Sequence, residues 1–453
     1  MPHKPIISIE VLCWGHAVGA LVLDPRYGVY AFEYYEDFRR SGWELSPLLA
    51  PRETPGALVF PNLSRETYYG LPAFIADSLP DSFGNLLIDR WMAAQGVSRQ
   101  QITPLDRLAY MGSRALGALE FRPALRDGAP APSALEMGAL VETARRALLV
   151  DLKRDVQNPT VTFATRLGAD DADDAATQSK LQQLIAIGTS AGGARAKAVV
   201  GYNSQADDFV AGQFALPPGY DHWIIKFDLS PAGTEGSGPR SAYGRIEYAY
   251  YLMALSCGID IEPSRLYEAA GQAHFMTKRF DRNAEGGKIH TQTLCALAGL
   301  DFNVRDTHDY HQAFMAAREL GLSYGALDEL FRRMVFNVAF ANNDDHTKNL
   351  SFLMTPDGAW TLAPAYDLTH AYNPNGLWTS RHLMAVNGKF EHIARADLLE
   401  LAQRYHVSSP QDCIDAILAV AADWPHYAEQ AGLDEQTTLR IAADIEQCTQ
   451  LLQ

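Results

Sequence analysis

The first 35 residues alternate hydrophobic and polar side chains in a way that is typical of short β-strands. Residues 7–11 read ISIEV, and residues 28–34 read GVYAFEY. Successive side chains of a strand point to opposite faces, so this alternation predicts antiparallel strands within residues 6–35. Helical spacing follows over residues 82–95. We therefore expect a small first domain over residues 1–125.

The most informative pattern in the chain lies further along, where a predicted helix leads into a polar loop. Residues 326–340 place leucine, phenylalanine, methionine and valine at helical spacing. Two apolar runs, residues 350–354 and 359–363, flank a turn that contains Pro-Asp-Gly, and together they predict a hairpin. Asp367 follows soon after it. The order is helix, polar loop, hairpin and aspartate.

The polar loop between helix and hairpin carries Asp344 and Asn349 in the pattern D-x-x-x-x-N. In protein kinases the Asp of this pattern takes the proton of the substrate hydroxyl, while the Asn and a later Asp bind metal. Asp345 does not have this spacing, so Asp344 is the candidate base. Asn349 and Asp367 are candidate Mg²⁺ ligands, because this cation prefers oxygen ligands. The alternative is an ordinary polar turn with Asp and Asn caps.

A strand and a helix upstream supply two further charged candidates. Residues 223–228 read WIIKFD, an apolar strand that holds Lys226, and Glu247 lies in a predicted helix over residues 245–252. A kinase uses such a lysine to bind nucleotide phosphates and such a glutamate to fix the lysine. The alternatives are an edge-strand lysine and a solvated helix glutamate.

Two more segments fit the same scheme but are less specific. Residues 188–197 read GTSAGGARAK, a glycine-rich turn whose free N–H groups could form an anion-binding nest, although it is neither a Walker A nor a dinucleotide motif. An ordinary flexible turn is the alternative.

Residues 274–282 read HFMTKRFDR, which predicts a strand that ends in charged residues and could become a hinge between lobes. A strand end held by salt bridges is the alternative there.

The composition of the chain excludes several classes of protein. The chain has 453 residues, with 38 Lys and Arg against 54 Asp and Glu, for a net charge of −16. This charge argues against a protein that wraps nucleic acid by itself.

The five cysteines are dispersed without a CxxC pair, and the sequence contains neither a long apolar run nor the core of a signal peptide. We therefore expect a cytoplasmic protein with no membrane span. Residues 126–132 and 229–243 are rich in Gly and Pro and predict a linker and a mobile loop.

Together these segments resemble the HipA family of serine/threonine kinases. The resemblance rests on six motifs in the family's order, SAGGARAK, WIIK, RIEY, KRFDR, DDHTKN and PAYD, and on YGLPAFIADSLP in the first domain. It implies an α+β, two-lobed protein-kinase-like fold. We expect a β-rich N-terminal domain over residues 1–125, a small lobe over residues 126–280 and a mostly helical large lobe over residues 281–453.

The resemblance also implies roles for individual residues. Asp344 would be the catalytic base with His346 supporting its loop, and Asn349 and Asp367 would hold Mg²⁺. Ser190 would be a self-phosphorylation site that disables the nucleotide loop. Residues 278–280 would form the hinge. Contacts with ATP would come from Gly192, Gly193, Lys197, Lys226, Glu247, Lys278 and Phe280.

The family's partners follow from the same resemblance. It implies a small helix-turn-helix, HipB-like antitoxin, contact with DNA only through that antitoxin, and a protein substrate such as an aminoacyl-tRNA synthetase. Two other functions remain open from the sequence. One is a catalytically silent ATP-binding module in an antitoxin–DNA complex. The other is a metal-dependent phosphohydrolase, for which the loop offers few bridging ligands.

Overall fold

The N-terminal part of the chain forms a twisted antiparallel sheet. The structure, a computed structural model, describes residues 4–125, 196–213, 215–228, 242–269 and 271–453, and six positions between 135 and 144. The sheet has the strand order β3-β2-β1-β4. Its strands are β1 (Ser8–Cys13), β2 (His16–Asp24), β3 (Val29–Tyr34) and β4 (Leu119–Arg122). The strands predicted within residues 6–35 are therefore confirmed.

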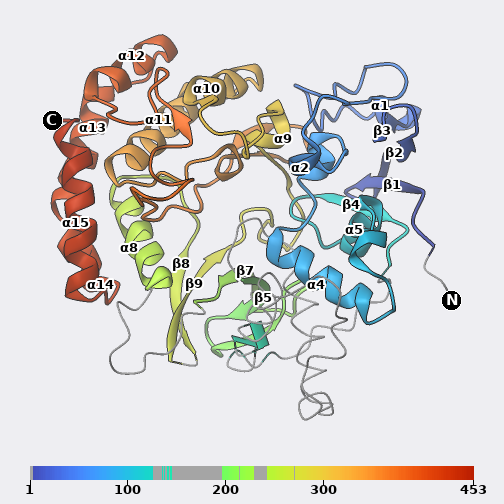
Figure 1. Cartoon of the computed structure of the whole chain (residues 1–453), viewed down its shortest axis with the longest axis horizontal. Coiled ribbons are helices and arrows are strands. Elements are labelled where there is room, and N and C mark those ends of the chain that lie inside the picture. The colour runs from blue at the N-terminus through green and yellow to red at the C-terminus, as the bar shows by residue number, and fades with distance from the viewer. Residues whose placement is uncertain are drawn as a thin grey trace.

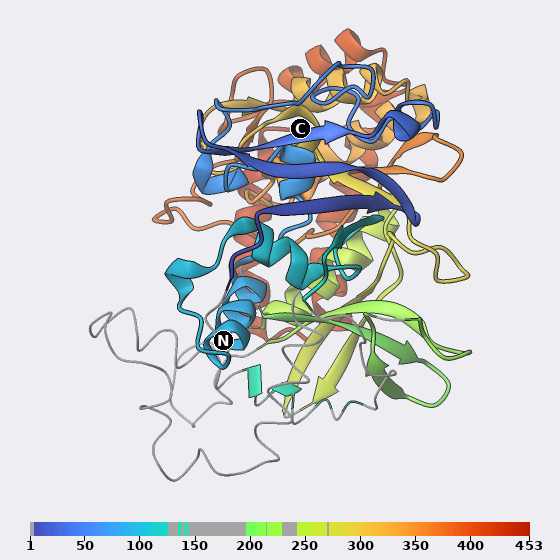
Figure 2. The ribbon, with the colours of Figure 1, turned by 90° about the vertical axis from the view of Figure 1, so that its right-hand side faces the viewer.

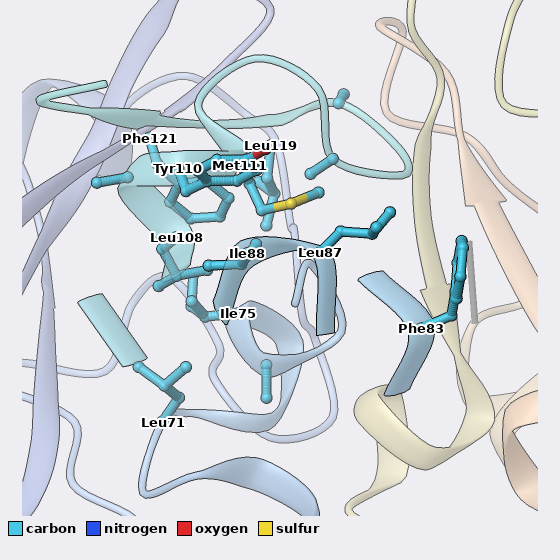
Figure 3. Close-up of a cluster of buried hydrophobic side chains, with 14 of the residues drawn as sticks. Leu71, Ile75, Phe83, Leu87, Ile88, Leu108, Tyr110, Met111, Leu119 and Phe121 are labelled. Carbon is cyan, nitrogen blue, oxygen red and sulfur yellow. The ribbon is translucent and has the colours of Figure 1, made fainter. Parts of the chain in front are cut away.

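Short helices cover this sheet and bury its apolar face. They are α1 (Glu36–Arg39), α2 (Arg65–Tyr68), α3 (Ala73–Ala76), α4 (Ser82–Ala93) and α5 (Pro104–Met111). Thr103 begins α5 with a reciprocal capping box to Asp106, and Pro104 occupies the first turn, where its missing N–H costs nothing. Figure 3 shows Leu87, Ile88, Leu108, Tyr110 and Phe121 packed together in this core, while Phe83 stands apart from them.

The next unit is a five-stranded antiparallel sheet with a helix packed on it. The strand order is β6-β5-β7-β9-β8, so β7 lies in the centre. The strands are β5 (Lys197–Asn203), β6 (Asp208–Ala211), β7 (Asp221–Lys226), β8 (Ser264–Ala269) and β9 (Gln272–Lys278). The helix α8 (Tyr243–Ser256) packs against β8 and β9. Apolar side chains of this sheet, such as Ile225 and Met276, share one continuous core with the N-terminal domain.

The remaining residues form a mostly helical lobe that contains a three-stranded sheet. Its helices include α9 (Leu294–Ala298), α10 (Tyr310–Glu319), α11 (Tyr324–Ala339), α12 (Arg395–Tyr405), α13 (Pro410–Ala422), α14 (Trp424–Gln430) and α15 (Glu435–Gln450). The strands β10 (His290–Thr293), β12 (Ser351–Met354) and β13 (Trp360–Leu362) pair in the order β10-β12-β13, and β11 (His308–Asp309) pairs with β14 (Met384–Ala385). The predicted helix over residues 326–340 and the predicted hairpin are both confirmed.

The three units surround a common centre. Figure 1 shows the helical lobe in orange and red on one side, the five-stranded sheet in green below, and the N-terminal domain in blue and cyan on the other side. Turned by 90°, the N-terminal domain lies in front of the helical lobe, and the five-stranded sheet lies below it (Figure 2). This is the expected α+β fold of two lobes with a β-rich N-terminal domain. In the described part of the chain, no helix has the length and hydrophobicity needed to cross a membrane.

Candidate active site

A lysine on the central strand of the small lobe meets two carboxylates from other elements. Lys226 is the last residue of β7, and its side chain is only 14% exposed. Its Nζ contacts Glu247 Oε1, from α8, and Asp367 Oδ1, which follows the hairpin β12–β13. The ion pair with Glu247 that the sequence suggested is therefore present. Lys226 lies on a central strand, so it is not the solvated edge residue that was the alternative.

The electrostatics of this group follow from burial and close opposite charges. Burial acts to lower the pKa of Lys226, but Asp367 and Glu247 outweigh burial and raise it. Burial likewise acts to raise the pKa of Asp367, yet the ammonium groups of Lys226 and Lys197 lower it to about 2. Asp367 is therefore ionised at neutral pH and available as a metal ligand. Its φ of 54° lies in the left-handed region, which is uncommon for a residue other than glycine.

The loop between α11 and β12 presents Asp344 toward solvent and fixes Asn349. The Asp344 side chain is 47% exposed, and its Oδ1 lies 3.9 Å from Nε2 of His346. The Asn349 side-chain amide donates to the Asp344 carbonyl oxygen at 2.7 Å. Because the amide nitrogen is engaged there, the side-chain oxygen of Asn349 is left as the group that can act as a metal ligand. His346 packs against the ring of Phe302 at 5.3 Å.

Asp345, next to the candidate base, is an anchor of this loop. It is buried, and its Oδ2 accepts a hydrogen bond from the Tyr310 hydroxyl at 2.9 Å and lies 3.0 Å from Nδ1 of His382. Its Oδ1 accepts from the Leu383 N–H at 2.8 Å. Both oxygens are thus used inside the protein, so Asp345 is not placed as the metal ligand that a phosphohydrolase would need. The sequence pattern gave no sign of these partners.

A second tyrosine ties the Asp367 segment to the loop between α11 and β12. The Tyr366 hydroxyl donates to the Lys348 carbonyl oxygen at 2.6 Å and lies 2.5 Å from Ser351 Oγ. The ring of Tyr366 also contacts Phe280 at 5.5 Å between centroids. The two candidate metal ligands, Asn349 and Asp367, therefore stand on segments that are held together. The sequence alone did not single out Tyr366.

The predicted hinge follows β9 and is held by charges. Lys278 ends β9 and pairs with Asp221 at 2.9 Å. Arg279 donates two hydrogen bonds to Asp281 at 2.7 and 2.6 Å, and Arg282 donates to the same carboxylate at 2.7 Å. The segment thus combines the two interpretations of the sequence, since it joins the lobes and is also fixed by salt bridges.

The glycine-rich loop is only partly described. Ser190, Gly192 and Gly193 lie outside the residues that the structure describes. Lys197, at the end of that loop, begins β5 and lies opposite Lys226 in the register of the sheet. Its side chain is buried, and burial lowers its pKa. The predicted linker over residues 126–132 and most of the loop at 229–243 also lie outside the described residues.

Family models match both parts of this architecture. A model of the HipA N-terminal domain matches residues 9–122, and a model of the HipA-like C-terminal domain matches residues 189–451. The second match covers more than half of the chain. The chain belongs to the HipA family. This confirms the resemblance that the motifs indicated.

Individual similar proteins show how far the similarity extends. A Shewanella oneidensis HipA, solved with HipB and its operator DNA, superposes with a TM-score of 0.62 at 19% identity, over 98% of this chain and 96% of that one. A protein named "Putative kinase" from Haemophilus influenzae is 26% identical over 27% of this chain and 39% of its own length. "Putative kinase Y4mE" from Sinorhizobium fredii is 28% identical over 28% of this chain and 32% of its own length. This chain thus spans well under half the length of each of these two relatives.

Within this HipA fold, the candidate residues fall into two groups. Lys226, Glu247 and Asp367 form one contact cluster, and Asp344, His346 and Asn349 form the adjoining loop. Lys278 and Phe280 stand on the segment that joins the lobes. The N-terminal domain also reaches this centre, because Asp81 lies 3.7 Å from Lys197. That contact joins residues 116 positions apart, and no local sequence pattern could have indicated it.

Proposed function

We propose that this protein is an ATP- and Mg²⁺-dependent kinase that phosphorylates a serine or threonine hydroxyl of a protein. One observation carries the proposal. Lys226, Glu247 and Asp367 come from a central strand, a helix and a segment after a hairpin, and their charged groups touch. Phosphoryl transfer depends mainly on positioning and on neutralising charge, and a fixed ammonium beside an ionised carboxylate supports both.

The residues of the cluster have distinct roles in this proposal. Lys226, held by Glu247, binds phosphate oxygens of ATP. Asp367 and the side-chain oxygen of Asn349 hold Mg²⁺, which when bound neutralises phosphate charge. Asp344 is exposed enough to meet a substrate hydroxyl and accepts its proton. His346 keeps the loop in place through its contact with Phe302.

The nucleotide base has a candidate site at the segment between the lobes. Lys278 ends β9, and Arg279 and Phe280 follow it directly, so backbone groups of this segment lie at the boundary between the small sheet and the helical lobe. Phe280 packs against Tyr366, which precedes Asp367. Contact of adenine with this segment would place the phosphates of ATP toward Lys226.

The test is phosphate transfer from γ-labelled ATP in the presence of Mg²⁺. The full chain is incubated with a bacterial lysate, and labelled proteins are identified by mass spectrometry. We expect one or a few labelled proteins with the natural chain and none with Asp344→Asn. An aminoacyl-tRNA synthetase is the expected class of substrate. ATP binding without any transfer would favour the catalytically silent binding module instead.

We also propose a small DNA-binding antitoxin as the partner. The Shewanella HipA that shares this fold was solved with HipB and operator DNA. The net charge of −16 suits a basic partner and disfavours direct contact with DNA. DNA would thus be reached only through a HipB-like protein.

Self-phosphorylation at Ser190 is a further part of the proposal. A phosphate on Ser190 would add about 1.5 to 2 negative charges beside a loop that is meant for ATP phosphates. We expect this to lower ATP affinity and stop transfer. Mass spectrometry after incubation with Mg-ATP tests the idea, with Ser190→Ala as the control. An active enzyme that leaves Ser190 unmodified would refute self-inactivation and leave the kinase proposal standing.

A further inference from the structure

A short segment of the N-terminal domain touches both lobes at the candidate nucleotide site. It runs from Asp77 to Asp81, between α3 and α4. Asp77 accepts hydrogen bonds from the backbone N–H of Thr293 at 2.7 Å and from its hydroxyl at 2.9 Å. Thr293 ends β10 and begins α9 in the helical lobe. Four residues later, Asp81 faces Lys197 of the small lobe. The segment therefore bridges the two lobes.

The lysine that Asp81 faces stands at the centre of the site. Lys197 is 4% exposed and lies directly opposite Lys226 across β5 and β7. Lys226 is already in contact with Glu247 and Asp367. Two buried ammonium groups side by side repel each other, so each needs a carboxylate nearby. Asp367 and Asp81 both act on the charge of Lys197, and Asp81, which lies 3.7 Å away, comes from another domain.

Asp81 is itself held rigidly by the helix that it begins. Its Oδ1 accepts a hydrogen bond from the Gly84 N–H at 2.7 Å and caps α4. Its Oδ2 is buried without a hydrogen-bond partner among the described residues and lies 3.7 Å from Lys197 Nζ. At this distance the interaction is between charges and is not a hydrogen bond. Because the cap fixes one oxygen, the other is fixed relative to Lys197.

We propose that Asp81 is a positioning residue of the nucleotide site, which holds the ammonium group of Lys197 where it can meet ATP phosphates. The inference rests on the proposed kinase function and on the ATP contact that the family resemblance implies for Lys197. It means that the N-terminal domain completes the catalytic centre. Asp77 supports the same arrangement by fixing the other end of the segment to the helical lobe.

The experiment compares the binding of Mg-ATP and of adenosine to the full chain and to Asp81→Asn. Asparagine still caps a helix, so this change removes the charge and keeps α4 in place. We expect Mg-ATP to bind more weakly, on the order of threefold to tenfold, as for residues coupled by direct contact. Adenosine has no phosphates, so its affinity should not change. Asp81→Ser, which also provides a cap, repeats the test if the first variant folds poorly.

A matched control lies on the same helix. Asp89 pairs with Arg107 at 2.7 Å and with Arg99 at 3.2 Å, all within the N-terminal domain. Asp89→Asn removes a carboxylate from α4 without touching either lobe, so both affinities should stay at the level of the natural chain. In a Lys197→Met background, Asp81→Asn should have no further effect on Mg-ATP binding.

The results of these binding experiments distinguish a failure of the Asp81 role from a failure of the kinase proposal. Unchanged Mg-ATP affinity in Asp81→Asn would overturn the positioning role while the kinase proposal stands. An equal loss for Mg-ATP and adenosine would also overturn it, because the residue would then only support the fold. If the natural chain binds no Mg-ATP, the proposed function itself fails, and the inference fails with it.

Discussion

At the scale of single residues, neighbouring side chains in the loop between α11 and β12 have opposite environments. Asp344 is 47% exposed, whereas the Asp345 side chain is 1% exposed and accepts hydrogen bonds within the protein. An exposed carboxylate can meet a substrate, while a buried one that is fully bonded holds the backbone in place. This difference supports the assignment of Asp344 as the base.

Asp344→Asn should abolish phosphoryl transfer and leave Mg-ATP binding largely intact. The base acts on the substrate hydroxyl and not on the nucleotide, and general base catalysis contributes roughly 10²- to 10⁴-fold to rates. Transfer is measured with labelled ATP and binding by calorimetry. Transfer near the natural rate would show that another group accepts the proton.

Asp367→Asn should remove most of the Mg²⁺ dependence of ATP binding. The change replaces an ionised ligand by a neutral one, and even residues that only support metal ligands contribute roughly 10- to 100-fold to metal affinity. ATP affinity is measured with Mg²⁺ and with a chelator. The measurement with chelator is the control, because it isolates the part of the effect that does not depend on metal. Lys226 loses its contact with Asp367 in this variant whether or not Mg²⁺ is present. An unchanged ratio of the two affinities would contradict the role of Asp367.

At the scale of elements, the segment between the lobes is fixed by a buried charge cluster. Asp281 lies between Arg279 and Arg282 and also accepts a hydrogen bond at 2.8 Å from the Gly117 N–H of the N-terminal domain. Burial acts to raise the pKa of Asp281, but the two guanidinium groups hold it below the usual range. One carboxylate therefore ties the segment after β9 to the N-terminal domain.

Asp281→Ala should destabilise the fold by about 3–5 kcal/mol, because it leaves buried guanidinium groups without their anion. Chemical denaturation monitored by tryptophan fluorescence measures the change. Glu400→Ala is the control, since its pair with Arg404 at 3.3 Å is exposed and such pairs contribute about 0–1 kcal/mol. Equal effects of the two substitutions would show that the Asp281 cluster does not hold the segment.

At the scale of the whole molecule, the N-terminal domain is part of the core and not an appendage. The buried cluster that begins with Ile9 and Val11 of β1 continues to Ile225 of β7 and Met276 of β9. Polar contacts add to it, including the hydrogen bond from Trp14 Nε1 to the Lys288 carbonyl oxygen at 2.8 Å. We therefore expect the domain and the lobes to unfold together.

The purified chain should not bind DNA at physiological salt, and a basic HipB-like protein should bring it to DNA. The reason is the net charge of −16, which opposes binding to phosphates. Fluorescence anisotropy with labelled operator DNA measures binding by the chain alone, by the antitoxin alone and by the mixture. Tight binding by the chain alone would contradict this arrangement.

The sequence determined the local elements and identified the candidate residues of the site. Alternating residues predicted β1 to β3, helical spacing predicted α11, and the Pro-Asp-Gly turn predicted the hairpin β12–β13, because each depends on neighbours a few residues apart. The spacing of Asp344 and Asn349 could be recognised for the same reason. Their roles as base and metal ligand stay predictions.

Only the tertiary structure decided which distant residues meet. The contacts of Lys226 with Asp367, of Asp345 with Tyr310 and of Asp81 with Lys197 join residues 141, 35 and 116 positions apart. Such contacts depend on how strands and helices pack across the whole chain, and no periodicity within one element specifies that packing. For this reason the sequence could name the kinase-like residues but not the N-terminal carboxylate that faces Lys197.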